Sequence, residues 1–203
     1  MTVTKTIREH IRRIPAGRPF LSASLVRYGS RAAVDQVLSR LEKAKVILRV
    51  ARGVYVRPRL STILGPVHPG VFEVAQAVAE AEGAQVAIHG AAWALKFGLT
   101  TQVMTSSTFL TNGRTRRLHV GKALLTLRHA SPLEMRLAES PSGRAILALR
   151  WLNEPASPQW AMEKLRAALS SSEWGEFQAE AATEGGWIAK AVKEFQPPRK
   201  GTL

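Results

Sequence analysis

The residues best suited to chemistry in this chain are the polar and basic side chains of the run 30–43. Arg31 can donate two hydrogen bonds to guanine O6 and N7, and Gln36 can pair with adenine N6 and N7. Arg40 and Lys43, further along the run, suit contacts with backbone phosphates. The remaining candidates for base or phosphate contact in this run are Ser30, Ala32, Ala33 and Ser39. The run therefore predicts a surface that reads DNA.

Catalytic chemistry has little to build on. The chain contains one aspartate, Asp35, which lies in the same run, and no cysteine. The five histidines show no metal-ligand spacing, and there is no glycine-rich phosphate loop or nucleophile elbow. Metal-dependent nucleases hold Mg²⁺ through clustered carboxylates. We therefore expect no enzymatic activity, no metal and no cofactor, although metal-free chemistry on a partner is an open alternative.

Positive charge is concentrated at the start of the chain. Residues 1–60 contain 14 Lys and Arg against 3 acids, whereas residues 61–203 contain 15 against 12. Each Lys or Arg that meets a phosphate releases a condensed counterion, so a dense positive field favours polyanions. Double-stranded DNA is the partner that this asymmetry predicts.

Hydrophobic spacing predicts the elements that position these residues. Three helices are expected, over residues 4–14, 22–28 and 30–44. Gly29 separates the last two, and Ser30 is the expected N-cap of the third. A β-hairpin over 46–56 follows, with Arg49 and Arg52 available for phosphates or the minor groove. Three helices followed by a basic hairpin predict a winged helix-turn-helix DNA-binding domain over residues 1–58.

The rest of the chain predicts a second domain. Residues 59–70 are rich in proline and glycine and are expected to form a linker. Residues 71–203 are expected to form an α+β domain with a small antiparallel sheet, a hairpin turn at Asn112-Gly113 and a helical C-terminal section that ends in a frayed tail over 197–203. The overall fold class is therefore α+β. No apolar run approaches the roughly 20 residues that span a bilayer, so we expect a cytoplasmic protein without a membrane partner.

A second basic group lies in this expected domain, with no acid between residues 112 and 130. Its members are Arg114, Arg116, Arg117, Lys122 and Arg128. One interpretation is a second surface for a polyanion or an acidic partner. The other is an exposed sheet edge whose charges prevent aggregation.

Several stretches resemble AbiEi-type antitoxins of bacterial type IV toxin–antitoxin systems. They are SRAAVDQVLSRLEKAKVILRVARGVYV, then GLTTQV, FLTNGRTRRLHVGK and LRHASP, which together cover about the first 135 residues. The resemblance implies that a winged helix binds inverted repeats in its own promoter, with DNA contacts over 30–43 and 49–52. It further implies that the C-terminal domain counters a nucleotidyltransferase-like toxin, either directly or without a stable complex.

The primary hypothesis is therefore a DNA-binding autorepressor and antitoxin, which would bind a palindromic site as a homodimer. The alternative, from another class, is an RNA-binding or RNA-processing protein that uses the basic residues over 114–128. Against this alternative, Phe109 is the only aromatic residue between Gly98 and Leu133, whereas single-strand recognition favours aromatic stacking.

Overall fold

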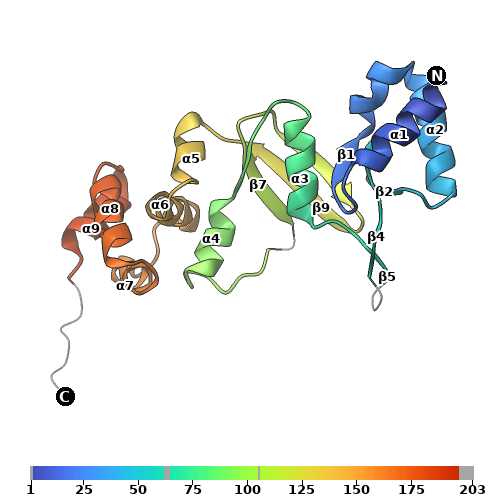
Figure 1. Ribbon diagram of the computed structural model, residues 1–203. Helices are drawn as coiled ribbons and strands as arrows, with labels where there is room; N and C mark the ends of the chain where they lie inside the picture. The colour runs from blue at the N-terminus through green and yellow to red at the C-terminus, as the bar shows by residue number, and fades with distance from the viewer. Residues whose placement is uncertain (1, 62–64, 105, 197–203) are drawn as a thin grey trace. The chain divides into compact units, whose positions relative to one another are not determined.

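The computed structural model describes residues 2–61, 65–104 and 106–196 of the chain (Figure 1). The fold is mixed α+β, as predicted. The chain forms two compact units, residues 1–86 with 106–129 and residues 87–105 with 130–203. The expected linker over 59–70 lies in the first unit, apart from residues 62–64, which are outside the described part. The domain boundaries expected from the sequence stay a prediction about which segments fold independently.

The first unit begins with three helices that share one core. They are α1 (Val3–Arg13), the 3₁₀ helix η1 (Ser22–Tyr28) and α2 (Arg31–Lys43). Ile7 and Ile11, one turn apart on α1, pack with Leu25 and with the apolar face of α2, which lies beside α1 (Figure 1). Val26 of η1 is 42% exposed. We refer to residues 2–58 as the head.

A three-stranded antiparallel sheet completes the head. Its strands are β1 (Pro19–Leu21), β2 (Leu48–Ala51) and β3 (Val54–Val56), in the order β1-β3-β2. The hairpin of β2 and β3 was predicted, but β1 was not. Tyr55 of β3 packs in the helical core, whereas Val54 and Val56 pack in a second core on the opposite face of the sheet. Strand β3 is therefore buried on both faces.

A short antiparallel pair follows the head in the region expected as a linker. It consists of β4 (Arg59–Ser61) and β5 (Gly65–Val67), with Arg59 opposite Val67.

The second core of the first unit lies under α3 (Val71–Glu80) and a mixed sheet. The strands of this sheet are β6 (Val86–Ile88), β7 (Ser107–Thr111), β8 (Arg116–Val120) and β9 (Ala123–His129), in the order β6-β7-β9-β8. The division between the two units falls within β6. Leu125 and Leu127 of β9 pack with Val74 and Val78 of α3 and with the valines of the β2–β3 hairpin.

The sheet contradicts the hairpin expected at Asn112-Gly113. Strand β9 lies between β7 and β8 and pairs with β7 in parallel, so the sheet is mixed rather than antiparallel. Gly113 does not adopt the positive φ that a type I′ turn needs. Instead, the Asn112 carboxamide oxygen accepts a hydrogen bond from the Gln85 backbone N–H, and the Thr111 hydroxyl donates to the Gln85 carbonyl. These bonds tie the loop to the segment before β6.

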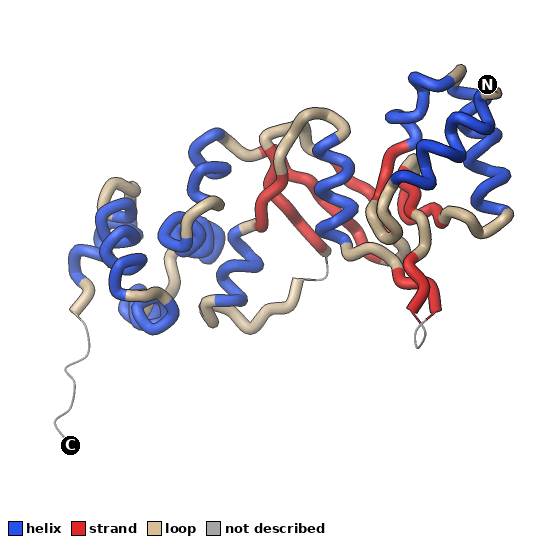
Figure 2. The backbone as a smooth tube through the Cα atoms, in the orientation of Figure 1, coloured by secondary structure: helices blue, strands red, loops and turns tan. Residues whose placement is uncertain are grey.

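The second unit is dominated by helices, and after His129 the described residues contain only helices and loops (Figure 2). The helices are α4 (Gly90–Lys96), α5 (Pro132–Leu137), α6 (Pro141–Leu152), α7 (Pro158–Ala168), α8 (Ser171–Ala181) and α9 (Gly186–Glu194). Helix α6 packs against α4 and α8, and α7 packs against α9. The helical C-terminal section was predicted, whereas its expected tail over 197–203 lies outside the described residues.

Candidate nucleic-acid interface

Helix α2 exposes most of the side chains that the sequence assigns to base reading. The Ser30 hydroxyl caps the helix by accepting a hydrogen bond from the Ala33 backbone N–H at 3.3 Å. The apolar face, which carries Val34, Val37, Leu38 and Leu41, is buried in the head. The other side of α2 is exposed, and seven predicted contact residues lie on it: Ser30, Arg31, Ala32, Gln36, Ser39, Arg40 and Lys43. The eighth, Ala33, is half-buried.

Four of these residues form the outermost part of α2. Successive residues of an α-helix are about 100° apart around its axis. At this spacing one side lies directly opposite the buried face, and it carries Ala32, Gln36, Ser39 and Lys43, which we call the outer stripe. Arg31 flanks the outer stripe on one side and Arg40 on the other. A partner that approaches α2 along its exposed side meets the outer stripe first.

Arg31 is already engaged by an acid of the same helix. Its Nε atom lies 3.0 Å from Oδ2 of Asp35, and both side chains are more than half exposed. This ion pair between residues four apart fixes the guanidinium along the helix rather than outward. Because the pair is exposed, it contributes at most about 1 kcal/mol and is easily exchanged for a phosphate or a base.

The hairpin places Arg49 on the helix-facing side of the sheet. Arg49 lies opposite Tyr55 in the register of β2 and β3, so both side chains are on the helix-facing side of the sheet. Burial raises the pKa of Tyr55, and the positive charge of Arg49 acts in the opposite direction. Arg49, a predicted contact residue, therefore lies on the same side of the sheet as the helical core.

Arg52 lies at the tip of the hairpin. Gly53 has a φ of +75°, a conformation that favours glycine, and its carbonyl accepts a hydrogen bond from the Ser22 backbone N–H at 2.9 Å. This bond holds the turn against the start of η1. The Arg52 side chain is exposed.

Sequence reasoning missed a cluster between α1 and η1. The Tyr28 hydroxyl lies 3.1 Å from Nδ1 of His10, and the guanidinium carbon of Arg27 lies 4.9 Å from the centre of the Tyr28 ring. Burial lowers the pKa of His10, and the positive charges of Arg27 and Arg13 lower it further. Both effects disfavour the protonated form of His10. An i, i+4 pattern on α1 does not reveal these partners, since they come from η1.

The second basic group is divided by the structure. Glu82, which lies before β6, forms ion pairs with both Arg114, at 2.9 Å, and Arg116. Arg117 and Lys122 are exposed. The last member, Arg128, is half-buried, and its Nη1 donates a hydrogen bond to the His129 carbonyl at 3.3 Å. Because side chains alternate along a strand, Arg116 and Arg117 lie on opposite faces of β8. Because Glu82 lies outside residues 112–130, the absence of acids in that range did not indicate that these arginines have a carboxylate partner.

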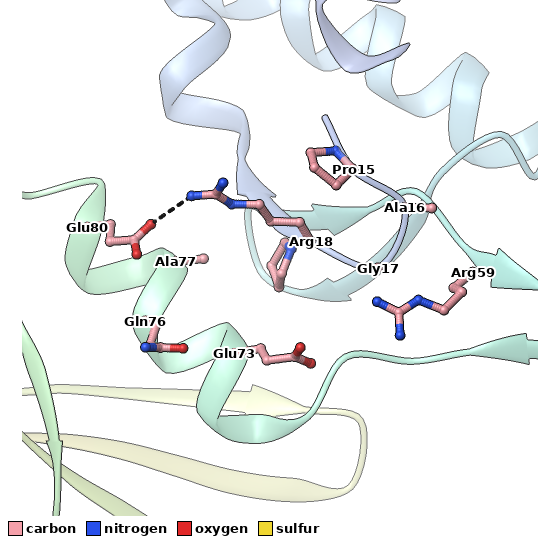
Figure 3. Close-up of a pocket in the computed structure, with 10 residues that line it drawn as sticks. Pro15, Ala16, Gly17, Arg18, Arg59, Glu73, Gln76, Ala77 and Glu80 are labelled. Carbon is pink, nitrogen blue, oxygen red and sulfur yellow. Dashed lines mark ion pairs between the residues drawn. The ribbon is translucent and has the colours of Figure 1, made fainter. Parts of the chain in front are cut away.

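A cavity of about 300 Å³ lies beside the turn that follows α1 (Figure 3). The turn 15–18 contributes Gly17, which has a φ of +86°, and a Cβ added there would lie 3.1 Å from Nη2 of Arg59. Across the cavity, Arg18 forms an ion pair with Glu80 of α3 at 3.5 Å. Glu73 accepts a hydrogen bond from the Gly70 backbone N–H at 2.7 Å. The acids of this cavity are therefore already engaged by the chain itself.

The structure describes residues 2–61, 65–104 and 106–196 of the chain. Within this part no group of three or more His, Asp or Glu side chains is placed to hold a metal ion. No helix there is long and apolar enough to cross a membrane.

Comparison with known proteins places the chain in a family without a known activity. No curated protein and no solved structure matches it. One family model matches residues 6–175, which include the whole of α2, the β2–β3 hairpin and the basic residues of β8 and β9. The chain therefore belongs to the family of unknown function DUF6088.

Proposed function

We propose that residues 1–58 form a winged helix-turn-helix that binds double-stranded DNA. The observation that carries the proposal is the outer stripe of α2, which is exposed beside Arg31 on a segment with 13 Lys and Arg against 3 acids. The order helix, strand, two helices and hairpin supports it, because this arrangement presents one helix and one turn on the same side. In this proposal Arg31 and the outer stripe up to Ser39 enter the major groove. Arg40 and Lys43 contact phosphates, and Arg49 and Arg52 contact phosphates or the minor groove.

We propose further that the chain represses its own promoter and acts as the antitoxin of a type IV toxin–antitoxin system in the cytoplasm. This part rests on the resemblance to AbiEi-type antitoxins, which implies inverted repeats as the operator and a nucleotidyltransferase-like toxin as the target. Inverted repeats require two heads about 34–36 Å apart, or a multiple of that distance, and hence a homodimer on DNA. The chain has no catalytic role in this proposal and needs no cofactor.

A gel-shift titration of the full chain tests the DNA-binding proposal. The probes are the DNA upstream of its own gene and a random fragment of equal length, each at two salt concentrations. We expect the upstream fragment to bind at least about a thousandfold more tightly, as specific regulators do. Equal affinity for both fragments, lost together as salt rises, would show that the head is only an electrostatic anchor.

The antitoxin proposal needs a separate experiment. Expression of a nucleotidyltransferase-like protein encoded beside this chain should arrest growth, and co-expression of the chain should restore it. A variant with Gln36→Ala and Lys43→Ala should lose promoter binding but keep this rescue, since the proposal assigns the two activities to different parts of the chain. If the chain fails to restore growth, the antitoxin proposal is wrong and the DNA-binding proposal is unaffected.

The alternative of an RNA-binding surface over residues 114–128 gains no support from the geometry. Glu82 pairs with two of its arginines, and Arg116 and Arg117 point to opposite faces of β8. A surface divided in this way does not offer one continuous track to a nucleic acid backbone.

A further inference from the structure

The head contains a second concentration of positive charge, separate from the outer stripe. Arg8 and Arg12 lie one turn apart on α1, and Arg57 follows β3. These three arginines surround a hollow of about 210 Å³, whose other lining residues are Ile11, Leu41 and Val46. We call this hollow the arginine groove. Its lining contains three guanidinium groups and no acid.

Within the described residues the arginines of the groove have no carboxylate partner, whereas several other arginines do. Arg18, Arg31, Arg114, Arg116 and Arg150 each form an ion pair with a carboxylate. In the part of the chain that the structure describes, Arg8, Arg12 and Arg57 form none. Like charges around one small hollow repel each other, so an anion placed between them lowers the energy of all three. The uncompensated positive charge of the groove therefore favours the binding of an anion.

One of the three guanidinium groups is held in place. Nη1 of Arg57 donates to the Arg12 carbonyl at 2.6 Å and to the Ile14 carbonyl at 2.8 Å. These carbonyls are at the C-terminal end of α1, where helix carbonyls lack partners within the helix. The remaining donors of Arg57 stay available beside Arg8 and Arg12. A fixed guanidinium loses less side-chain entropy when it binds a phosphate or carboxylate.

The floor of the groove is apolar. Ile11 and Leu41 are almost fully buried, whereas Val46 is 48% exposed. A bare inorganic ion would leave Val46 exposed to water. A ligand with an apolar body would cover it and gain the free energy of burying that surface.

The lining of the groove shares no residue with the surface proposed to meet DNA. Leu41, in its lining, and Lys43, in the outer stripe, are two residues apart and hence about 200° apart around α2. One DNA duplex on the outer stripe therefore leaves the groove open to another anion. We propose that the arginine groove binds a small organic anion, a phosphate or carboxylate attached to an aromatic or branched apolar group. This site does not depend on DNA binding by the head.

Calorimetric titration of the full chain with phenyl phosphate, and separately with inorganic phosphate, tests the proposal. We expect one saturable site for phenyl phosphate, with inorganic phosphate binding at least about tenfold more weakly. Arg8→Gln and Arg12→Gln should each weaken phenyl phosphate binding about tenfold, because each removes a charge-assisted hydrogen bond. Val46→Ser should reduce the preference for phenyl phosphate over inorganic phosphate and leave inorganic phosphate binding unchanged.

Arg13→Gln provides the matched control. Arg13 is exposed on the same helix and carries the same charge, but it does not line the groove. Its loss should change phenyl phosphate affinity less than twofold. The proposal is overturned if Arg13→Gln weakens binding as much as Arg12→Gln, since that result would mean non-specific attraction to a basic head. It is also overturned if both phosphates bind equally, or if Arg8→Gln and Arg12→Gln leave phenyl phosphate affinity unchanged.

Discussion

Arg31 must exchange one partner for another when it contacts a base. In the free chain its guanidinium is paired with Asp35. Under the DNA-binding proposal, Arg31→Ala should relax the preference at one base position by about 1–3 kcal/mol and weaken specific binding by the same amount. Fluorescence anisotropy with an operator and its single-base variants measures both quantities. Unchanged affinity and unchanged base preference would show that α2 is not the reading helix.

Lys43→Ala is the matched comparison for that variant, since it removes the same charge from the same helix. It should weaken binding to all sequences about equally and reduce the salt slope by about 1, as expected for a phosphate contact.

Asp35 places a negative charge within the proposed interface. Asp35→Asn removes this charge and releases Arg31, so we expect tighter binding to operator and random DNA, by about 1 kcal/mol or less. The same anisotropy titrations measure it, and the gain should shrink as salt rises. Weaker binding by Asp35→Asn would mean that Asp35 is needed to orient Arg31.

His10 predicts how the stability of the head depends on pH. Its pKa in the folded chain lies below the ordinary value of 6.5. Below about pH 6.5 the unfolded chain therefore binds a proton that the folded chain resists, and the free energy of unfolding falls as pH falls. Urea unfolding at pH 7.5 and pH 5.5 should show this loss, and His10→Gln should make it smaller. An equal loss in His10→Gln would assign the pH dependence to other groups.

At the scale of elements, two glycines in the second unit should respond in opposite directions to alanine. A Cβ at Gly90 of α4 would overlap the Leu147 carbonyl of α6, whereas a Cβ at Gly175 of α8 would meet nothing within 4 Å. Gly90→Ala should cost about 1–3 kcal/mol through overpacking. Gly175→Ala should stabilise α8 by about 0.5–1 kcal/mol, because alanine has the higher helix propensity. Thermal unfolding measures both, and stabilisation by Gly90→Ala would contradict the close approach of α4 and α6.

Helices were predictable because their signals are local. Ser131-Pro132, Ser140-Pro141 and Ser157-Pro158 each place a hydroxyl cap before a proline in the first turn, and α5, α6 and α7 begin there. Likewise, Ser30 and the apolar spacing after it define α2 and its exposed side. The exposed residues of the candidate site follow from that pattern.

Strand order and charge partners were not predictable, because they depend on distant segments. Strand β1 needs β3 as its partner, 35 residues away in the register Phe20 to Tyr55. Asn112-Gly113 is a typical hairpin turn, but here Asn112 and Thr111 form hydrogen bonds with Gln85 and the hairpin does not form. The pairing of Glu82 with Arg114 and Arg116 also joins residues far apart in the sequence. The arginine groove likewise combines residues from α1, α2 and the segments after α2 and β3.

At the scale of the first unit, the head depends on the elements that cover the outer face of its sheet. Val50, Val54 and Val56 are buried against α3 and β9. A fragment of residues 1–58 would expose them, at a cost of about 1.5–3 kcal/mol each, which approaches the whole stability of a small domain. We expect this fragment to unfold without a cooperative transition in circular dichroism, whereas the full chain unfolds cooperatively. A cooperative transition in the fragment at the temperature of the full chain would show that the head folds independently.

The two cores on either side of β3 also determine how this strand can pair. A slip of one residue would turn Tyr55 toward the valines of α3 and turn Val54 and Val56 toward Ile7 and Ile11. The phenol ring would then overfill one core, and the valines would leave cavities in the other. The slipped pairing is therefore unfavourable in each core independently, so a strand of only three residues has a single register. That register also determines where Arg49 and Arg52 lie relative to α2.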